Sequence, residues 1–263
     1  MSVGAQLMAG RRILVTRPLE RDEQLMEQVV AAGGLVTHRP AIAFEPPEDR
    51  SGADEAVASL ASFQWLVLTS PTGVRFFLER LQESGLGPVP ETVRFAVVGP
   101  GTAKALGEAG YRPDLVPGSS DADGLAAGLA GEVLKGSRVL WVRPEVARPV
   151  LGEVLQAAGA EVVPAVFYRT VPHPGCREIA ADLVDGSYDG VLFTSPSTFR
   201  AVFDAVPRDR LAGFREVTRV AIGKVTAAAM EAAGHPPDAF ASEPTAGGVA
   251  QAFRAAFDSA PLC

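Results

Sequence analysis

Two short runs of hydroxyl-bearing residues, proline and glycine could each begin a ligand-binding helix. Each run directly follows an apolar segment, and the runs are Thr69-Ser70-Pro71-Thr72-Gly73 and Thr194-Ser195-Pro196-Ser197-Thr198. Serine and threonine cap helices, proline favours the first helical position, and glycine lets a ligand approach the backbone. Because the first turn of a helix has unpaired N–H groups and the positive end of the helix dipole, it attracts anions. The two runs therefore predict helix ends that can bind anions.

Four more segments of similar character follow other apolar runs. They contribute Gly99, Gly101 and Thr102 in one turn, Gly223, Lys224 and Thr226 in another, and the matching arginines Arg17 and Arg143. An arginine can bind a carboxylate through two parallel hydrogen bonds, and a lysine adds positive charge. For each helix start alone, an ordinary cap is the favoured explanation, and Lys224 alone favours a solvated side chain. For Arg17 and Arg143, a carboxylate contact is balanced by an ion pair with a neighbouring glutamate or a solvated side chain. Because the Thr-Ser-Pro turn occurs twice, we favour a site for a ligand with many acidic groups.

Tyr168 is a candidate proton donor in the aromatic stretch Val166–Pro172. A phenol in this stretch could donate a proton into a cleft. A half-buried strand aromatic with its hydroxyl in water explains the same residue. The residue types alone favour this second interpretation.

Motifs for common cofactors and metals are missing from the sequence. The glycines of residues 99–107 have the wrong spacing for a dinucleotide-binding loop, and there is no lysine-containing phosphate loop or nucleophile elbow. His38, His173 and His235 are scattered and have no metal-ligand spacing. We therefore expect neither a cofactor nor a metal.

An internal repeat determines how these segments are positioned. Residues 10–18 match residues 136–144, and residues 63–71 match residues 188–196, so two kinds of unit alternate along the chain. Each unit has short apolar runs typical of strands buried on both faces, followed by segments of helical spacing such as residues 24–32, 74–81 and 103–109. This order predicts α/β architecture with two similar domains, each a parallel sheet flanked by helices. The domains could be consecutive or one inserted in the other, and the repeat does not distinguish these arrangements.

The composition excludes several classes of protein. The chain has 263 residues, is 47% hydrophobic and has a net charge of −7, which disfavours a disordered chain or a nucleic-acid-binding surface. Its two cysteines, Cys176 and Cys263, are too few for a disulfide framework and fit a reducing compartment. No apolar stretch is long enough to span a membrane, and the N-terminus does not read as a signal peptide. We expect a cytoplasmic protein with no membrane partner.

Several of these motifs together resemble the uroporphyrinogen-III synthase family. They are the two Thr-Ser-Pro turns, the opening Ile13–Pro18, the turn Ile222–Ala227 and the stretch Tyr168-Arg169-Thr170, and the likeness extends from about Arg11 to Phe253. The resemblance implies two α/β domains joined by a two-stranded linker, one of them discontinuous. The implied boundaries are 1–39 with 174–263 for the first domain, 48–165 for the inserted domain, and 40–47 with 166–173 for the linker.

The resemblance also implies a reaction without cofactor or metal. A member of this family would cyclise linear hydroxymethylbilane to uroporphyrinogen III, with inversion of the last pyrrole ring and loss of water, in the synthesis of heme, siroheme and cobalamin. Tyr168 would donate a proton to the departing hydroxyl, and the eight substrate carboxylates would meet the helix ends described above. We expect a monomer whose only partner is this substrate. The alternative is a non-catalytic two-domain sensor that closes on an anionic metabolite; a nucleotide-sugar transferase would need an acidic ribose or metal contact that the sequence lacks.

Overall fold

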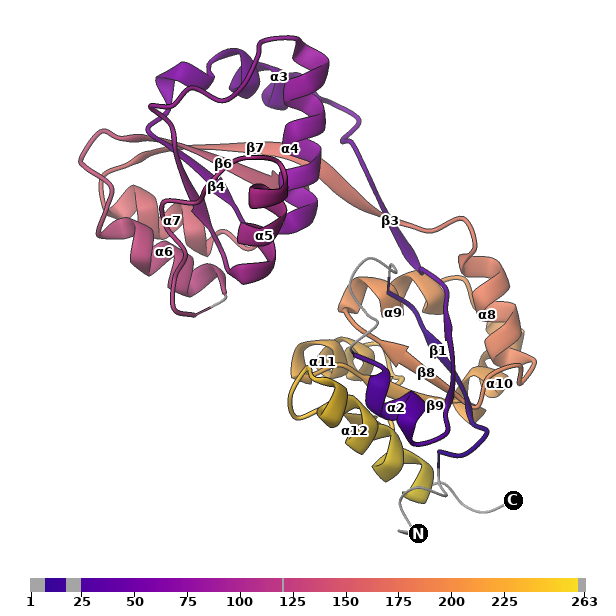
Figure 1. Ribbon diagram of the computed structural model, residues 1–263. Coiled ribbons are helices and arrows are strands. Elements are labelled where there is room, and N and C mark those ends of the chain that lie inside the picture. The colour runs from indigo at the N-terminus through magenta and orange to yellow at the C-terminus, as the bar shows by residue number, and fades with distance from the viewer. Residues whose placement is uncertain (1–7, 18–24, 120, 260–263) are drawn as a thin grey trace. The chain divides into compact units, whose positions relative to one another are not determined.

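The computed structural model describes residues 8–17, 25–119 and 121–259, and it divides into two compact units (Figure 1). Unit 1 consists of residues 1–43 and 171–263, and unit 2 consists of residues 44–170. The chain enters unit 2 within β3 (Ile42–Glu45) and leaves it within β7 (Glu161–Pro172). Both crossing points lie inside the stretches 40–47 and 166–173.

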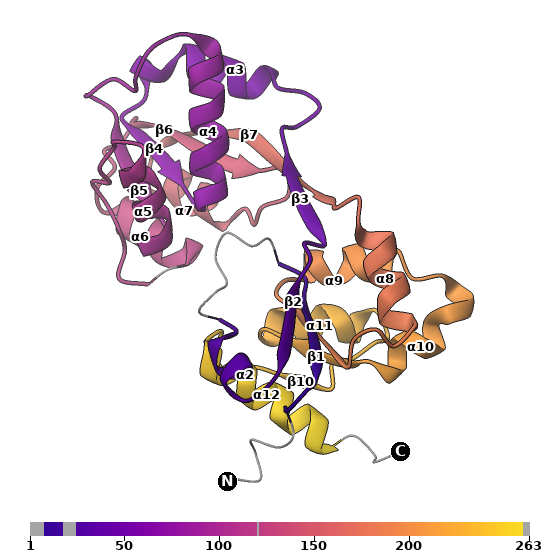
Figure 2. The same ribbon diagram turned by 45° about the vertical axis from the view of Figure 1, so that its right-hand side comes forward.

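Unit 1 is built on a parallel sheet with helices on its two faces. Its strand order is β10-β9-β8-β1-β2, and every neighbouring pair is parallel. The strands are β1 (Arg12–Val15), β2 (Leu35–His38), β8 (Gly190–Phe193), β9 (Thr218–Ala221) and β10 (Ala239–Phe240). The helices are α2 (Glu27–Ala31), α8 (Cys176–Val184), α9 (Pro196–Phe203), α10 (Leu211–Glu216), α11 (Lys224–Ala232) and α12 (Ala246–Ser259). Helices α2 and α12 lie side by side and bury Ile13 and Val15 of β1 (Figure 2).

Unit 2 repeats this architecture. Its sheet has the order β3-β7-β6-β4-β5, and β7, β6, β4 and β5 are mutually parallel neighbours. The remaining elements are β4 (Trp65–Leu68), β5 (Arg94–Val97), β6 (Arg138–Pro144), α3 (Ser51–Ala58), α4 (Pro71–Ser84), α5 (Pro100–Glu108), α6 (Ala122–Ala130) and α7 (Val150–Ala157). Along β6 the side chains alternate, so Leu140 and Val142 join the α3–α4 core while Val139 and Trp141 join the α6–α7 core. Figure 1 shows these helix pairs on opposite faces of the sheet.

The expected α/β fold with helix-flanked parallel sheets is confirmed. All four residues of β4, and all four of β8, are buried, as expected for central strands covered on both faces. The helix boundaries differ from those expected from spacing: α4 begins at Pro71 and α5 at Pro100, because their polar caps and prolines initiate the helices before the apolar pattern starts. The expected helix 24–32 begins at Glu27, and Gln24 lies outside the described residues. In the described part of the chain, no helix has the length and apolar character needed to cross a bilayer.

A Pro-Asp pair fixes the same loop to the same strand in both units. In unit 2, the Asp114 carboxylate accepts the Phe95 N–H at 2.8 Å, while the Asp114 N–H donates to the Phe95 carbonyl at 2.8 Å. In unit 1, Asp238 makes the same two bonds to Arg219, at 2.7 and 2.8 Å. The two carboxylates differ in a second contact. Asp238 also binds the guanidinium of Arg219, whose side chain is 9% exposed, whereas Asp114 lies 4.0 Å from the half-exposed guanidinium of Arg94.

This difference predicts unequal costs for removing the two carboxylates. We expect Asp238→Ala to lower the free energy of unfolding by about 2–4 kcal/mol, because a nearly buried guanidinium loses its partner, and Asp114→Ala by about 1–2 kcal/mol. Urea denaturation of both variants and the wild type would measure the costs. An equal loss in the two variants would show that the Arg219 ion pair adds nothing to stability.

Candidate functional site

The ends of adjacent parallel strands gather the sequence-predicted residues into one cluster in each unit. Carboxyl ends of neighbouring parallel strands lie at the same edge of a sheet, where ligands of α/β proteins bind. In unit 2, residues 69–73, residues 99–102 and Arg143 lie at the carboxyl ends of the neighbouring strands β4, β5 and β6. In unit 1, Arg17, residues 194–198 and residues 223–226 follow the neighbouring strands β1, β8 and β9.

Serine caps the first helix of each cluster with nearly identical geometry. Ser70 (φ −161°, ψ 155°) accepts the Gly73 N–H at 2.9 Å, and Ser195 (φ −163°, ψ 161°) accepts the Thr198 N–H at 3.1 Å. The Thr198 hydroxyl accepts the Ser195 N–H at 3.1 Å in return, which completes a capping box. Pro71 and Pro196 occupy the first helical positions. These hydroxyl groups hold the helix starts in place.

Backbone N–H groups are left for a ligand at these helix starts. Within the described part of the chain, the N–H groups of Thr72 and Ser197, one residue after each proline, donate to no protein group. Thr72 is half-buried and Ser197 is exposed. Because the helix dipole adds to the unpaired donors, each helix start favours an anion.

Glycine caps the second helix of each cluster without a side-chain hydrogen bond. Gly99 begins α5 and Gly223 begins α11, both with extended backbone that any residue can adopt. A Cβ atom at Gly223 would meet no protein atom within 4 Å, and the same holds at Gly101, the second residue of α5. Neither backbone conformation nor packing therefore requires glycine at position 223.

The other predicted contacts in these turns differ in accessibility. Thr102 and Thr226 are 2% and 3% exposed, so both residues pack inside their units, and the Thr102 N–H donates to the Gly99 carbonyl at 3.1 Å. Lys224 is exposed. Arg143 folds back on its own strand end, where its guanidinium donates to the carbonyls of Pro144 and Glu145 at 3.1 Å each. Arg17 is half-buried directly after β1.

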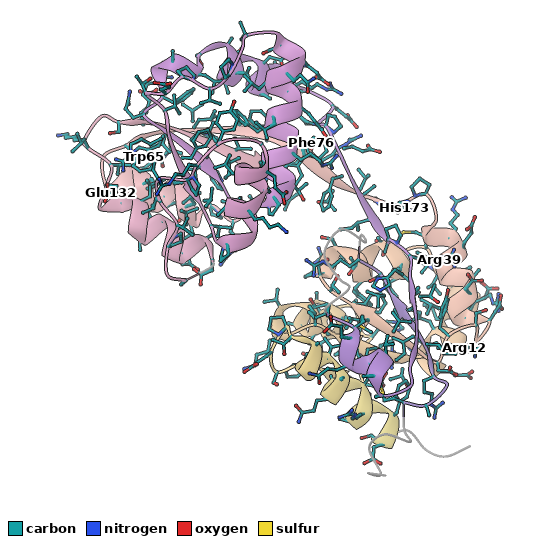
Figure 3. The ribbon with its side chains drawn as sticks, in the orientation of Figure 1. Arg12, Arg39, Trp65, Phe76, Glu132 and His173 are labelled. Carbon is teal, nitrogen blue, oxygen red and sulfur yellow. The ribbon has the colours of Figure 1, made fainter. Side chains whose placement is uncertain are left out.

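Tyr168 lies at the same edge of the unit 2 sheet, packed among aromatic rings. Its side chain is 6% exposed, and its hydroxyl lies 2.9 Å from the Ser70 hydroxyl. The Phe76 ring stacks on it at a centroid distance of 5.5 Å, and the Phe44 ring meets it edge-on at 5.8 Å. Figure 3 shows Phe76 on α4, the helix that Ser70 caps. The hydroxyl is therefore bonded to protein, unlike the water-exposed phenol considered from the sequence.

A bulge in β7 turns Tyr168 toward this helix. Arg143 pairs with Val166, but the next residue, Pro144, pairs with Tyr168, so Phe167 is an extra residue in the strand. Phe167 and Tyr168 consequently both pack on the α4 side, against Phe77 and Phe76 respectively. Bulges often redirect a side chain next to a functional site. Phe44 and Phe76 were not among the residues predicted from the sequence. The adjacent aromatic pairs 76–77 and 167–168 are the signal that could have found them.

The cation next to Tyr168 is already neutralised by protein carboxylates. Arg169 binds Glu48 and lies 3.5 Å from Glu45. The Glu48 hydrogen bond, supported by the charges of Glu48, Glu45 and Glu145, raises the pKa of Arg169 above its ordinary value. The Arg169 guanidinium therefore links β7 to residues 45–48 through these ion pairs. Across residues 8–17, 25–119 and 121–259, no three His, Cys, Asp or Glu side chains gather where they could hold a metal ion.

Known proteins are similar to this chain in both sequence and fold. The family model for uroporphyrinogen-III synthase HemD matches residues 23–251. A putative uroporphyrinogen-III synthase of Methanothermobacter thermautotrophicus is 32% identical over 82% of this chain and 87% of its own length. The uroporphyrinogen-III synthase of Synechococcus elongatus is 33% identical over 74% of each chain.

A solved structure agrees with the fold. The crystal structure of a mutant uroporphyrinogen III synthase from Thermus thermophilus covers 95% of this chain and 100% of its own, with a TM-score of 0.60 at 23% identity. The family model covers most of this chain, and two relatives exceed 30% identity over long alignments. The resemblance suggested by the motifs is therefore confirmed, and the chain belongs to the uroporphyrinogen-III synthase family of hydro-lyases.

Proposed function

We propose that this protein cyclises linear hydroxymethylbilane to uroporphyrinogen III, inverting the last pyrrole ring and releasing water. The observation that carries the proposal is the family match over residues 23–251. The two clusters of helix starts support it, because a substrate with eight carboxylates needs many anion-binding points. The net charge of −7 opposes such a substrate, so local donors must supply the attraction.

The binding part of the proposal assigns carboxylates to the starts of α4 and α5 in unit 2 and of α9 and α11 in unit 1. Unpaired N–H groups in the first helical turns bind them, with Lys224 adding an exposed charge. The hydroxyls of Ser70, Ser195 and Thr198 act mainly by holding the helix starts. Arg17 and Arg143 contribute positive charge at the two edges, and the carbonyls of Pro144 and Glu145 use two of the five guanidinium N–H donors of Arg143.

Two tasks make up the proposed chemistry: Tyr168 donates a proton, and the protein holds the substrate in position. Tyr168 gives its proton to the substrate hydroxyl as the carbon–oxygen bond breaks, and water departs. The electron pair of the adjacent pyrrole nitrogen stabilises the resulting cation, so the reaction requires no cofactor or metal. The protein then holds the chain so that the substituted carbon of the last ring attacks, which forms a spiro intermediate and inverts that ring. Holding the reacting atoms in place provides most of the acceleration.

The organisation of the protein is part of the same proposal. Residues 1–39 with 174–263 form one domain, residues 48–165 form the inserted domain, and residues 40–47 with 166–173 link them. The protein works as a monomer in the cytoplasm, with the tetrapyrrole as its partner and neither nucleic acid nor membrane involved. Compact units whose crossing points fall in β3 and β7 support this division.

Turnover of hydroxymethylbilane tests the proposed activity directly. Purified protein is expected to consume the substrate and give the isomer with one inverted ring, identified by chromatographic separation after oxidation to the porphyrin. Heat-denatured protein should give only the isomer without inversion. A non-catalytic sensor would bind the substrate and still leave only the non-inverted product, and this result would refute the activity.

Tyr168→Phe tests the proton donor while preserving the ring stack on Phe76. We expect kcat to fall by about 10²-fold, the lower end of the usual range for general acid catalysis, because the pyrrole nitrogen already assists departure. The product should remain the inverted isomer, since inversion depends on how the substrate is held. Tyr111→Phe is the matched control, because Tyr111 follows the C-terminal end of α5 and its hydroxyl accepts the Val89 N–H at 3.3 Å. Wild-type turnover in Tyr168→Phe would leave positioning alone as the mechanism.

Gly223→Ser tests whether a carboxylate approaches the start of α11. Serine is at least as good a helix cap as glycine, so we expect the Tm to stay within about 2 °C of the wild type. The added side chain enters space that no protein atom occupies, and there it should obstruct the ligand and raise KM by about tenfold. Gly107→Ala, near the far end of α5 and equally open, should leave KM unchanged. A normal KM in Gly223→Ser would remove this helix start from the binding site.

A further inference from the structure

The Ser70 hydroxyl has two partners, and only one of them belongs to its helix. It accepts the Gly73 N–H at 2.9 Å, which is an ordinary cap, and it also lies 2.9 Å from the Tyr168 hydroxyl. We propose that Ser70 is a positioning residue that donates its proton to the Tyr168 oxygen and so directs the Tyr168 proton toward the substrate. This inference rests on the proposed role of Tyr168.

The direction of the hydrogen bond determines whether Tyr168 can act. Each hydroxyl has one hydrogen, so only one of the two can donate across the 2.9 Å contact. If Tyr168 donated to Ser70, its proton would be held by the protein. If Ser70 donates, this contact does not use the Tyr168 proton, and the bond strengthens as the phenol oxygen becomes negative.

The serine hydroxyl and the start of α4 favour a negative charge on the Tyr168 oxygen. Ser70 caps α4, a helix of 14 residues, and the positive end of its dipole lies at this start. The Gly73 N–H already points at the Ser70 oxygen, which polarises the serine hydroxyl as a donor. The β7 bulge and the Phe76 stack hold the tyrosine ring in place. The hydrogen bond from Ser70 then restricts rotation of the tyrosine hydroxyl about its C–O bond.

Unit 1 contains the same cap without a tyrosine. Ser195 has the backbone conformation of Ser70 and accepts an N–H three residues later, but its hydroxyl faces Thr198 at 3.4 Å. Capping alone therefore does not require an aromatic hydroxyl at this position. Of the two matching turns, the one at Ser70 has the contact with a tyrosine hydroxyl.

The assisted step breaks one bond and transfers one proton. The carbon–oxygen bond of the substrate breaks, the hydroxyl takes the Tyr168 proton and leaves as water, and the pyrrole nitrogen pair forms a carbon–nitrogen double bond. The phenolate that remains is stabilised by the Ser70 hydroxyl and the start of α4. The proton that the substrate loses when the macrocycle is completed restores the phenol. Ser70 itself gives up no proton and forms no bond to the substrate in this step.

A double-mutant cycle separates this role from helix capping. We expect Ser70→Ala to lower kcat about tenfold with KM within twofold, a loss typical of one hydrogen bond to a developing charge. In the Tyr168→Phe background the same change should lower kcat by less than about twofold, because the bond is already absent. Ser70→Thr, which keeps the hydroxyl, should recover most of the activity. If Ser70→Ala fails to fold, Ser70→Gly removes the hydroxyl while remaining an acceptable cap.

Ser195→Ala is the matched control for loss of a serine cap. Its effect on kcat should be the same factor in the wild type and in Tyr168→Phe, because the Ser195 hydroxyl bonds within its own cap, to the N–H and hydroxyl of Thr198. The Ser70 proposal is overturned if Ser70→Ala has no effect, if its effect is equal in both backgrounds, or if Ser70→Thr does not recover activity. Those results leave the role of Tyr168 intact as long as Tyr168→Phe is slow. Wild-type turnover in Tyr168→Phe would overturn both proposals.

Discussion

Parallel pairing of neighbouring strands is the constraint on which the site in each unit depends. Because parallel strands must be joined by crossovers, the helices that follow β4, β5, β8 and β9 all begin at the carboxyl edge of their sheets. Each start contributes unpaired N–H groups and the positive end of a dipole. The topology therefore concentrates potential anion-binding groups at one edge of each sheet. The remaining requirement is that no protein side chain fills the space at these helix starts. The open space beside Gly223 meets that condition, and so do the N–H groups of Thr72 and Ser197, which donate to no group in the described part of the chain.

The repeat gives each unit the same framework, and the differences between the copies bear on the proposed chemistry. Ser70 and Ser195 have nearly the same φ and ψ angles, and Gly99 and Gly223 also have matching φ and ψ angles. The carboxylates of Asp114 and Asp238 accept a backbone N–H from equivalent strands. Only unit 2 places a tyrosine beside its serine cap. This asymmetry follows from the β7 bulge, because one inserted residue, Phe167, turns its neighbour to the face that α4 covers. A local irregularity in one strand thus separates the proposed proton donor from a routine core aromatic.

Much of the site was predictable because its ingredients are local. Caps, prolines and glycines act within a few residues, so Ser70, Ser195, Gly99 and Gly223 could be placed at helix starts from the sequence. The accessibility of the side chains was not predictable, because it depends on packing against distant elements. Thr102 and Thr226 are buried, and Arg143 is bound to the carbonyls beside it.

The sequence by itself determined the fold class, the repeat, the helix starts and the family, since apolar periodicity, turn chemistry and ordered motifs are all written along the chain. Tertiary structure decided which segments form each unit, because strand order brings β1 beside β8 across most of the sequence. It also decided the environment of Tyr168. The bulge depends on the pairing of β7 with β6, and the bond to Ser70 joins residues 98 positions apart, with the stack on Phe76 spanning a similar separation. No local pattern encodes such contacts, because they arise only when β7 and α4 pack on the same face of one sheet.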